Sequence, residues 1–171
     1  MIEIERKFLV INFPNIGINL KTLKKNKIVQ GYISTLADKT QVRLRNINNE
    51  SYFLTIKTKT SHDLQRVETE TQLTASQFQR LWPTVERRTI TKTRYYIPHG
   101  SYNLELDLYG GKLMGLVTVE AEFQSLDEAK TFIPPSWVEK EISTDSSYGN
   151  PHLAVLGLPS NFKGSSRRTA F

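Results

Sequence analysis

The chain opens with charged residues at alternate positions, Glu3, Glu5 and Lys7. On a β-strand, side chains two residues apart lie on one face, separated by roughly 7 Å. On a helix, Glu3 and Lys7 would share a face, but Glu5 would point away from both. Apolar residues between and after the three favour the strand, so two carboxylates and an ammonium line up. Carboxylate oxygens bind hard divalent cations, and an ammonium binds phosphate, so this row could serve a site for metal and phosphate together.

The same alternation recurs along the chain, with like charges paired. The acidic rows are Glu3/Glu5, Glu68/Glu70, Glu105/Asp107 and Glu120/Glu122, and the basic rows are Arg43/Arg45, Lys57/Lys59 and Lys92/Arg94. Any strand with one face in water also alternates, and a single such pair is usually solvated surface. Like charges two residues apart repel one another, however, so stability alone does not generate the whole set. The rows make sense if divalent cations bridge the carboxylates and a polyanion bridges the bases.

Segments with a period of two residues predict the elements that must carry these rows. Strands are predicted near 2–10, 28–35, 40–47, 51–58, 65–73, 89–97, 102–109 and 115–124, with a weaker strand near 137–143. Short helices are predicted over 74–82, with Thr74 as N-cap and Pro83 at the end, over 125–132, and from about 151 to 156. Short connections imply antiparallel hairpins, and about eight such strands predict a sandwich or a barrel. An eight-stranded barrel is wide enough for side chains or one small ligand.

Composition limits the class of protein. A length of 171 residues predicts one domain, with a loose tail after about residue 164. The net charge of +6 suits an anionic partner, but aromatic residues do not alternate with the bases as nucleic-acid binding would need. Absence of cysteine excludes disulfides and thiolate chemistry, and three scattered histidines lack the spacing of metal ligands. Neither a secretory leader nor a run of 18 apolar residues occurs, so a cytoplasmic enzyme or binding protein is expected, with no membrane partner.

The charged strands together resemble the CYTH superfamily, also called triphosphate tunnel metalloenzymes. The matching motifs follow in order: ExExK at 3–7, QGY at 30–32, RxR at 43–45, TxK at 55–57, ExE at 68–70, KxRY at 92–95, ELD at 105–107 and GLxxxExEF at 115–123. They cover nearly the whole chain, which we therefore expect to be a single CYTH-like domain over 1–171. One departure occurs in the late stretch 145–150, similar to the family's DxxYxN, where Ser147 stands in the place of an expected basic residue.

The resemblance implies a mainly β fold, an antiparallel eight-stranded β-barrel tunnel with a few short helices, that binds triphosphates with Mg²⁺ or Mn²⁺. Carried over by position, the metal carboxylates are Glu3, Glu5, Glu120 and Glu122, joined by Asp107 as a second-metal or water-positioning group. Glu68 and Glu70 are the expected catalytic carboxylates, together with Lys92. The expected phosphate-binding residues are Lys7, Arg43, Arg45, Lys57, Lys92 and Arg94. Tyr32 is expected to be a packed tyrosine, with substrate orientation near one mouth as the alternative.

The function expected from this resemblance is metal-dependent hydrolysis of inorganic tripolyphosphate to pyrophosphate and phosphate. Three alternatives stay open: an adenylyl cyclase of the same superfamily, a thiamine triphosphatase, and a non-catalytic module that binds polyphosphate. A homodimer is one option for the assembly. The sequence does not distinguish a tunnel open at both ends from one plugged by a C-terminal helix.

Overall fold

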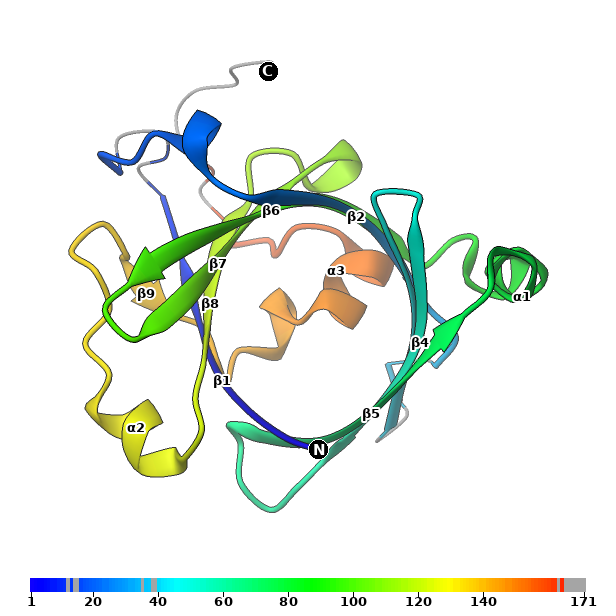
Figure 1. The fold of residues 1–171 in the computed structure, drawn as a ribbon, viewed down its shortest axis with the longest axis horizontal. Coiled ribbons are helices and arrows are strands. Elements are labelled where there is room, and N and C mark those ends of the chain that lie inside the picture. Colours follow the sequence, from blue (N-terminus) through cyan, green and yellow to red (C-terminus); the bar gives the residue numbers. More distant parts are fainter. Residues whose placement is uncertain (12, 14–15, 35, 38–39, 163, 165–171) are drawn as a thin grey trace.

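A computed structural model describes residues 1–11, 13, 16–34, 36–37, 40–162 and 164, and Figure 1 shows its strands curving into a barrel. The strands are β1 (Ile2–Leu9), β2 (Lys25–Tyr32), β3 (Thr40–Ile47), β4 (Ser51–Lys59), β5 (Gln65–Leu73), β6 (Thr89–His99), β7 (Tyr102–Tyr109), β8 (Val117–Glu122) and β9 (Lys140–Glu141). Their order in the sheet is β5-β4-β3-β2-β6-β7-β8-β1-β9, and every pair is antiparallel. The predicted tail after residue 164 lies outside the described residues.

The barrel closes through β1, which pairs with a different strand along each part of its length. Ile2 to Ile4 pair with Val67 to Gln65 on β5, and Glu5 to Leu9 pair with β8. The short β9 pairs with Phe8 and Leu9 and lies outside the ring of eight. The predicted antiparallel eight-stranded barrel is therefore confirmed. Several boundaries differ, most of all at β2, which begins at Lys25 rather than near 28, because Lys25 to Lys27 pair with β6, and ends at Tyr32 rather than near 35. The weaker strand predicted near 137–143 is reduced to Lys140–Glu141.

Short helices flank the barrel at the predicted places: α1 (Ala75–Leu81), α2 (Leu126–Thr131) and α3 (Asn150–Leu156). Thr74 caps α1 as expected, in a reciprocal capping box with Gln77. The α-helix ends at Leu81, before Pro83, as expected. The chain continues as a 3₁₀ turn, η2 (Trp82–Val85), with the proline in its first turn, where a missing N–H does no harm. Further 3₁₀ turns are η1 (Leu20–Thr22), η3 (Gly111–Leu113) and η4 (Ser146–Tyr148).

Apolar packing lies mainly outside the barrel, which leaves the interior to polar side chains. Outside β1, β7 and β8, residues such as Phe8, Leu106 and Val119 pack with Phe132 after α2. On the far side, α1 and η2 cover β3 through Leu44, Phe78 and Val85. The two faces of each strand therefore separate apolar from charged residues, as the alternation predicted.

The C-terminal helix α3 covers one end of the barrel, and Figure 1 shows it within the outline of the ring. Leu153 and Ala154 of α3 are buried against a set that includes Leu9, Tyr32 and Tyr109, at the ends of β1, β2 and β7. A plug of this kind was one of the two arrangements left open by the sequence. No helix in the described part of the chain is long and apolar enough to span a membrane.

Candidate active site

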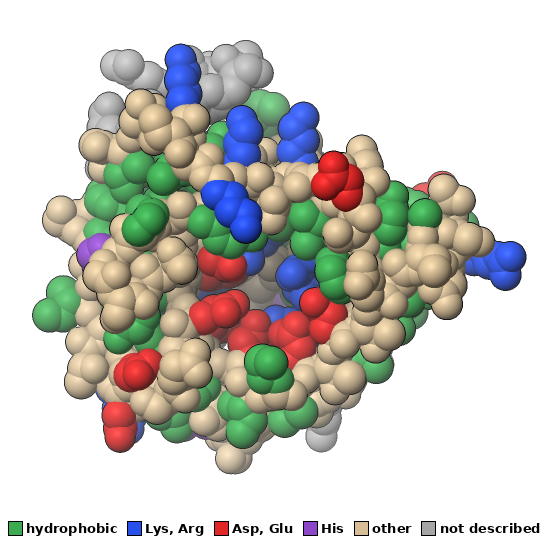
Figure 2. Space-filling model, in the orientation of Figure 1, with side chains coloured by type: hydrophobic (Ala, Val, Ile, Leu, Met, Phe, Trp, Pro, Cys, Tyr) green, Lys and Arg blue, Asp and Glu red, His purple; other side chains and the backbone are tan. Residues whose placement is uncertain are grey.

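A cavity of about 410 Å³ lies inside the barrel. Figure 2 shows the molecule hollowed there, with acidic side chains gathered along one side of the opening and basic side chains deeper inside. Charged residues of seven strands line this cavity: Glu3, Glu5, Lys7, Arg43, Arg45, Lys57, Glu68, Glu70, Lys92, Arg94, Glu105, Glu120 and Glu122. All the residues predicted for the site line it except Asp107. The volume is that of a typical small-molecule site.

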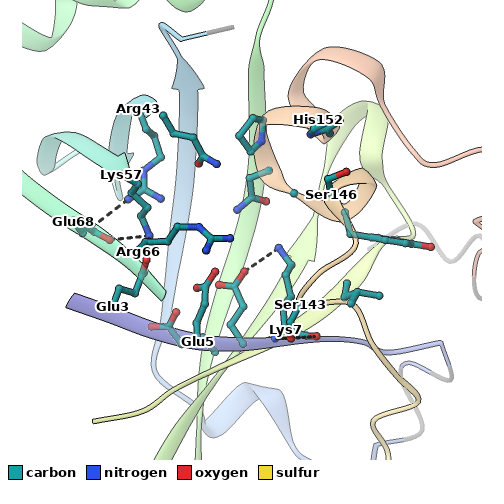
Figure 3. A pocket seen from close by; sticks show the side chains of 18 of the residues that line it. Glu3, Glu5, Lys7, Arg43, Lys57, Arg66, Glu68, Ser143, Ser146 and His152 are labelled. Carbon is teal, nitrogen blue, oxygen red and sulfur yellow. Dashed lines mark hydrogen bonds and ion pairs between the residues drawn. The ribbon is translucent and has the colours of Figure 1, made fainter. Parts of the chain in front are cut away.

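Lys57 on β4 joins carboxylates of β1 and β5. Its ammonium lies 2.6 Å from each oxygen of Glu3 and 2.8 Å from Glu68 Oε2. Figure 3 shows Glu3 and Glu68 both directed at this ammonium. Because burial and the neighbouring Glu5 disfavour a further negative charge, the pKa of Glu3 is raised to about 7. Lys57 is therefore held by two strands that flank the closure of the barrel.

A second cluster surrounds Glu120 on β8. Lys7 Nζ lies 2.9 Å from Glu120 Oε1, and Arg94 Nη2 lies 2.5 Å from Glu120 Oε2. Burial alone would raise the pKa of Glu120, but Lys7 and Arg94 hold it well below its usual value. Glu120 is thus an ionised carboxylate with a cation on each oxygen.

Asp107 occupies a different place from the other predicted metal carboxylates. It is fully buried behind the cavity wall, and its oxygens accept hydrogen bonds from Arg94 Nε at 2.7 Å, Arg94 Nη2 at 2.6 Å and Lys92 Nζ at 2.5 Å. Burial opposes its charge, yet Arg94 and Lys92 lower its pKa. Burial and Arg94 in turn lower the pKa of Lys92 to about 8. The carboxylate of Asp107 fixes the two cations against the wall.

The two arginines of β3 differ in their partners. Arg43 donates to Thr55 Oγ1 at 3.1 Å and lies 3.9 Å from Glu68 and 3.7 Å from Glu70. Arg45 makes no ion pair with any residue that the structure describes, and its buried Nε, like that of Arg43, has no hydrogen-bond partner there. Burial and the like charges of Arg43 and Arg94 lower the pKa of Arg45 to about 10. Arg45 is a half-buried guanidinium without an anionic partner among the described residues.

Glu5 on β1 and Glu122 on β8 are neighbouring carboxylates that line the cavity. Their Cα atoms are partners across β1 and β8, and neither side chain has an ion pair among the described residues. Burial and Glu5 raise the pKa of Glu122. Carboxylate oxygens are the donors that Mg²⁺ and Mn²⁺ prefer, so this donor set fits such a cation chemically. Within the described ranges, however, no three metal-binding side chains already converge on one point.

Several cavity residues were not identified from the sequence. Arg66 lines the cavity and lies two residues before Glu68, so extending the period of two by one step could have found it. His152, one of the three scattered histidines, is half-buried and lines the cavity together with Ser143 and Ser146. No local pattern marks His152, Ser143 and Ser146, because the packing of the C-terminal segment brings them there, with Ile142 and Leu153 buried in one cluster.

Tyr32 and Ser147, two residues singled out in the sequence, have clear positions in the structure. Tyr32 is buried, lies against α3 and receives a hydrogen bond from Gln30 Nε2 at 2.6 Å, so it is a packed tyrosine whose ring also reaches the cavity. Ser147, at the position of the expected base, donates to Asp145 Oδ1 at 2.6 Å and does not line the cavity.

Comparison with known proteins places this charged barrel in a family. A CYTH domain model matches residues 1–142. The chain belongs to the CYTH domain family. It is 43% identical to an inorganic triphosphatase of Nitrosomonas europaea over 161 residues, which cover 93% of this chain and 100% of the relative. It is 34% identical to an inorganic triphosphatase of Acetivibrio thermocellus, with 94% and 97% covered.

Solved structures share the architecture. A crystal structure of an inorganic triphosphatase superposes with a TM-score of 0.63 at 40% identity, covering 90% of this chain and 94% of that one. A Hippeastrum protein with a dominant triphosphatase activity matches with a TM-score of 0.57 at 15% identity, covering 75% and 82%. At that identity the second match demonstrates the common fold alone.

Proposed function

We propose that this CYTH protein is a metal-dependent triphosphatase that hydrolyses inorganic tripolyphosphate to pyrophosphate and phosphate. The observation that carries the proposal is a cavity in which rows of carboxylates and rows of bases face one another. Relatives named inorganic triphosphatase, matched over nearly their full length, support it. We also propose that 1–171 is one domain, since α3 beyond the family match packs into the end of the barrel.

Glu3, Glu5, Glu120 and Glu122 would hold a divalent cation, Mg²⁺ or Mn²⁺. When bound, such a cation supplies charge neutralisation and polarisation of phosphoryl oxygens. Bases on the opposite strands, chiefly Arg43, Arg45 and Lys57, would bind the remaining phosphate oxygens. Phosphoryl transfer depends on positioning and on charge stabilisation more than on covalent chemistry, and the charged residues that line the cavity would provide both.

Glu68 is proposed as the group that accepts a proton from the attacking water, with Glu70 beside it. Lys57 keeps the pKa of Glu68 low in spite of burial, so its carboxylate is ionised at neutral pH. As water oxygen bonds to phosphorus, the bond to the leaving pyrophosphate breaks and the water proton passes to the carboxylate. Asp107 is proposed to position Lys92 and Arg94 on the cavity wall, since its own oxygens are occupied by them.

The test is phosphate release from tripolyphosphate, ATP and thiamine triphosphate, each with Mg²⁺, Mn²⁺ or EDTA. The proposal predicts metal-dependent release that is fastest with tripolyphosphate. Conversion of ATP to cAMP and pyrophosphate would point to a cyclase instead. Tight binding of tripolyphosphate without release under any metal would point to a binding module.

A further inference from the structure

The groups proposed to bind metal and those proposed to bind phosphate are partners of one another in the free protein. Lys57 contacts both oxygens of Glu3 at 2.6 Å. Glu120 has Lys7 at 2.9 Å on one oxygen and Arg94 at 2.5 Å on the other. Two of the four proposed metal carboxylates are therefore occupied by cations of the protein itself. A metal ion that used them would have to displace an ammonium or a guanidinium.

The remaining proposed metal carboxylates, Glu5 and Glu122, are free of ion pairs within the described ranges, as shown above. These two carboxylates are available to a cation but do not make a full set of protein ligands. This agrees with the lack of three converging donors among the described residues. Lys57 differs from Lys7 in accessibility: its side chain is 15% exposed and that of Lys7 is 9% exposed. Lys57 is accordingly the cation that an entering phosphate reaches more easily.

We infer that metal and triphosphate bind this site cooperatively because Lys57 exchanges Glu3 for a phosphate oxygen. This inference rests on the proposed function. A metal ion alone must compete with Lys57 for Glu3, and a triphosphate alone must draw Lys57 away from a carboxylate that is then left unpaired. When both are present, each ligand satisfies the group that the other has released. By linkage, each must raise the affinity of the other by the same factor, which for coupled sites is typically about 5- to 150-fold.

The first test is the affinity for Mn²⁺ alone, measured by titration calorimetry in wild type, Lys57→Met and Lys59→Met. Methionine preserves the apolar stem and removes the ammonium. Loss of the competitor for Glu3 should tighten Mn²⁺ binding on the order of tenfold in Lys57→Met. Lys59 is the matched control, because it lies two residues further on the same face of β4 and lines the cavity without an ion pair among the described residues. Its removal reports the effect of one less positive charge, and we expect a much smaller gain.

The reciprocal test is the binding of tripolyphosphate in EDTA, where no metal is present. Glu3→Gln removes one of the two carboxylates that hold Lys57, leaving Glu68, and should tighten this binding, whereas Lys57→Met should weaken it. Circular dichroism and thermal melts establish that each variant is folded. The pair of variants keeps the test decisive even if one of them is unstable.

Mn²⁺ affinity in Lys57→Met that equals that of wild type, or of Lys59→Met, would overturn the exchange. So would unchanged tripolyphosphate binding in Glu3→Gln. These results are separable from failure of the proposed function, since they leave metal-dependent phosphate release by wild type intact. Absence of that release with every metal would remove the function on which the exchange rests.

Discussion

Replacing Arg45 by methionine is expected to stabilise the free protein while weakening its binding of tripolyphosphate. Arg45 lines the cavity, its Nε is buried without a partner, and it has no ion pair among the described residues. The charge therefore contributes repulsion and desolvation to the free protein without compensation. A methionine keeps most of the apolar stem, so the packing of β3 should be largely retained.

The size of the effect follows from the perturbation of the guanidinium. Burial, Arg43 and Arg94 lower the pKa of Arg45 from its usual value above 12 to about 10. At about 1.4 kcal/mol per pKa unit this gives an upper bound of ~3.5 kcal/mol. Cavity solvent screens the charge, so we expect the substitution to gain about 1–2 kcal/mol, a rise in Tm of roughly 2–8 °C for a chain of this size. Hydrogen bonds from a charged donor contribute about 1.5–3 kcal/mol, so tripolyphosphate affinity should fall roughly 10- to 100-fold.

The assay pairs thermal denaturation without ligand with calorimetric titration of tripolyphosphate. Arg43→Met is the matched control, two residues away on the same face of β3. Because Arg43 already has Thr55, Glu68 and Glu70 as partners, its loss should lower Tm or leave it unchanged. A fall in Tm for Arg45→Met as large as that for Arg43→Met would refute the reasoning, as would unchanged affinity for tripolyphosphate.

Three further predictions concern the pH dependence and the packing of the barrel. Folded protein holds a proton on Glu3 between about pH 4.5 and 7, so the free energy of unfolding should fall as pH rises through this window, and melts of Glu3→Gln should show a flatter dependence. Asp107→Asn removes the buried carboxylate that Lys92 and Arg94 share, and should lower the free energy of unfolding by about 3–5 kcal/mol in denaturant titration. A loss below about 1 kcal/mol would contradict this. Gly31→Ala places a Cβ 2.5 Å from Val85 Cγ2 and should cost about 1–3 kcal/mol, with part of the loss restored by Val85→Ala; equal melting of single and double variants would count against the clash.

Period-two patterns were enough to predict which face of each strand lines the cavity. Glu68 and Arg94 are examples, since a strand residue's face depends only on its parity once one neighbour is placed. Parity does not predict how deeply a side chain is buried. Asp107 has the same parity as Glu105, yet it is fully buried behind the wall while Glu105 lines the cavity, because the cations of β6 cover it.

Contacts between distant segments could not be predicted from local patterns. Lys57 meets Glu3 across 54 positions of sequence, and only the closure of β1 onto β5 brings them together. His152 reaches the cavity because Leu153 and Ala154 pack into the end of the barrel. The pairing of Lys57, a proposed phosphate-binding base, with Glu3, a proposed metal carboxylate, is a consequence of that closure, and no single motif contains it.

The most direct test of the central claim is phosphate release from tripolyphosphate by Glu5→Gln and Glu122→Gln in the presence of Mg²⁺ or Mn²⁺. Changes around metal ligands commonly reduce activity 10- to 100-fold, so loss of a ligand carboxylate should reduce release by at least about 100-fold. Glu86→Gln, on an exposed residue outside the cavity, is the matched control and should retain activity. Melting temperatures close to wild type would show that the barrel is intact. Near-normal turnover in both cavity variants would contradict the account.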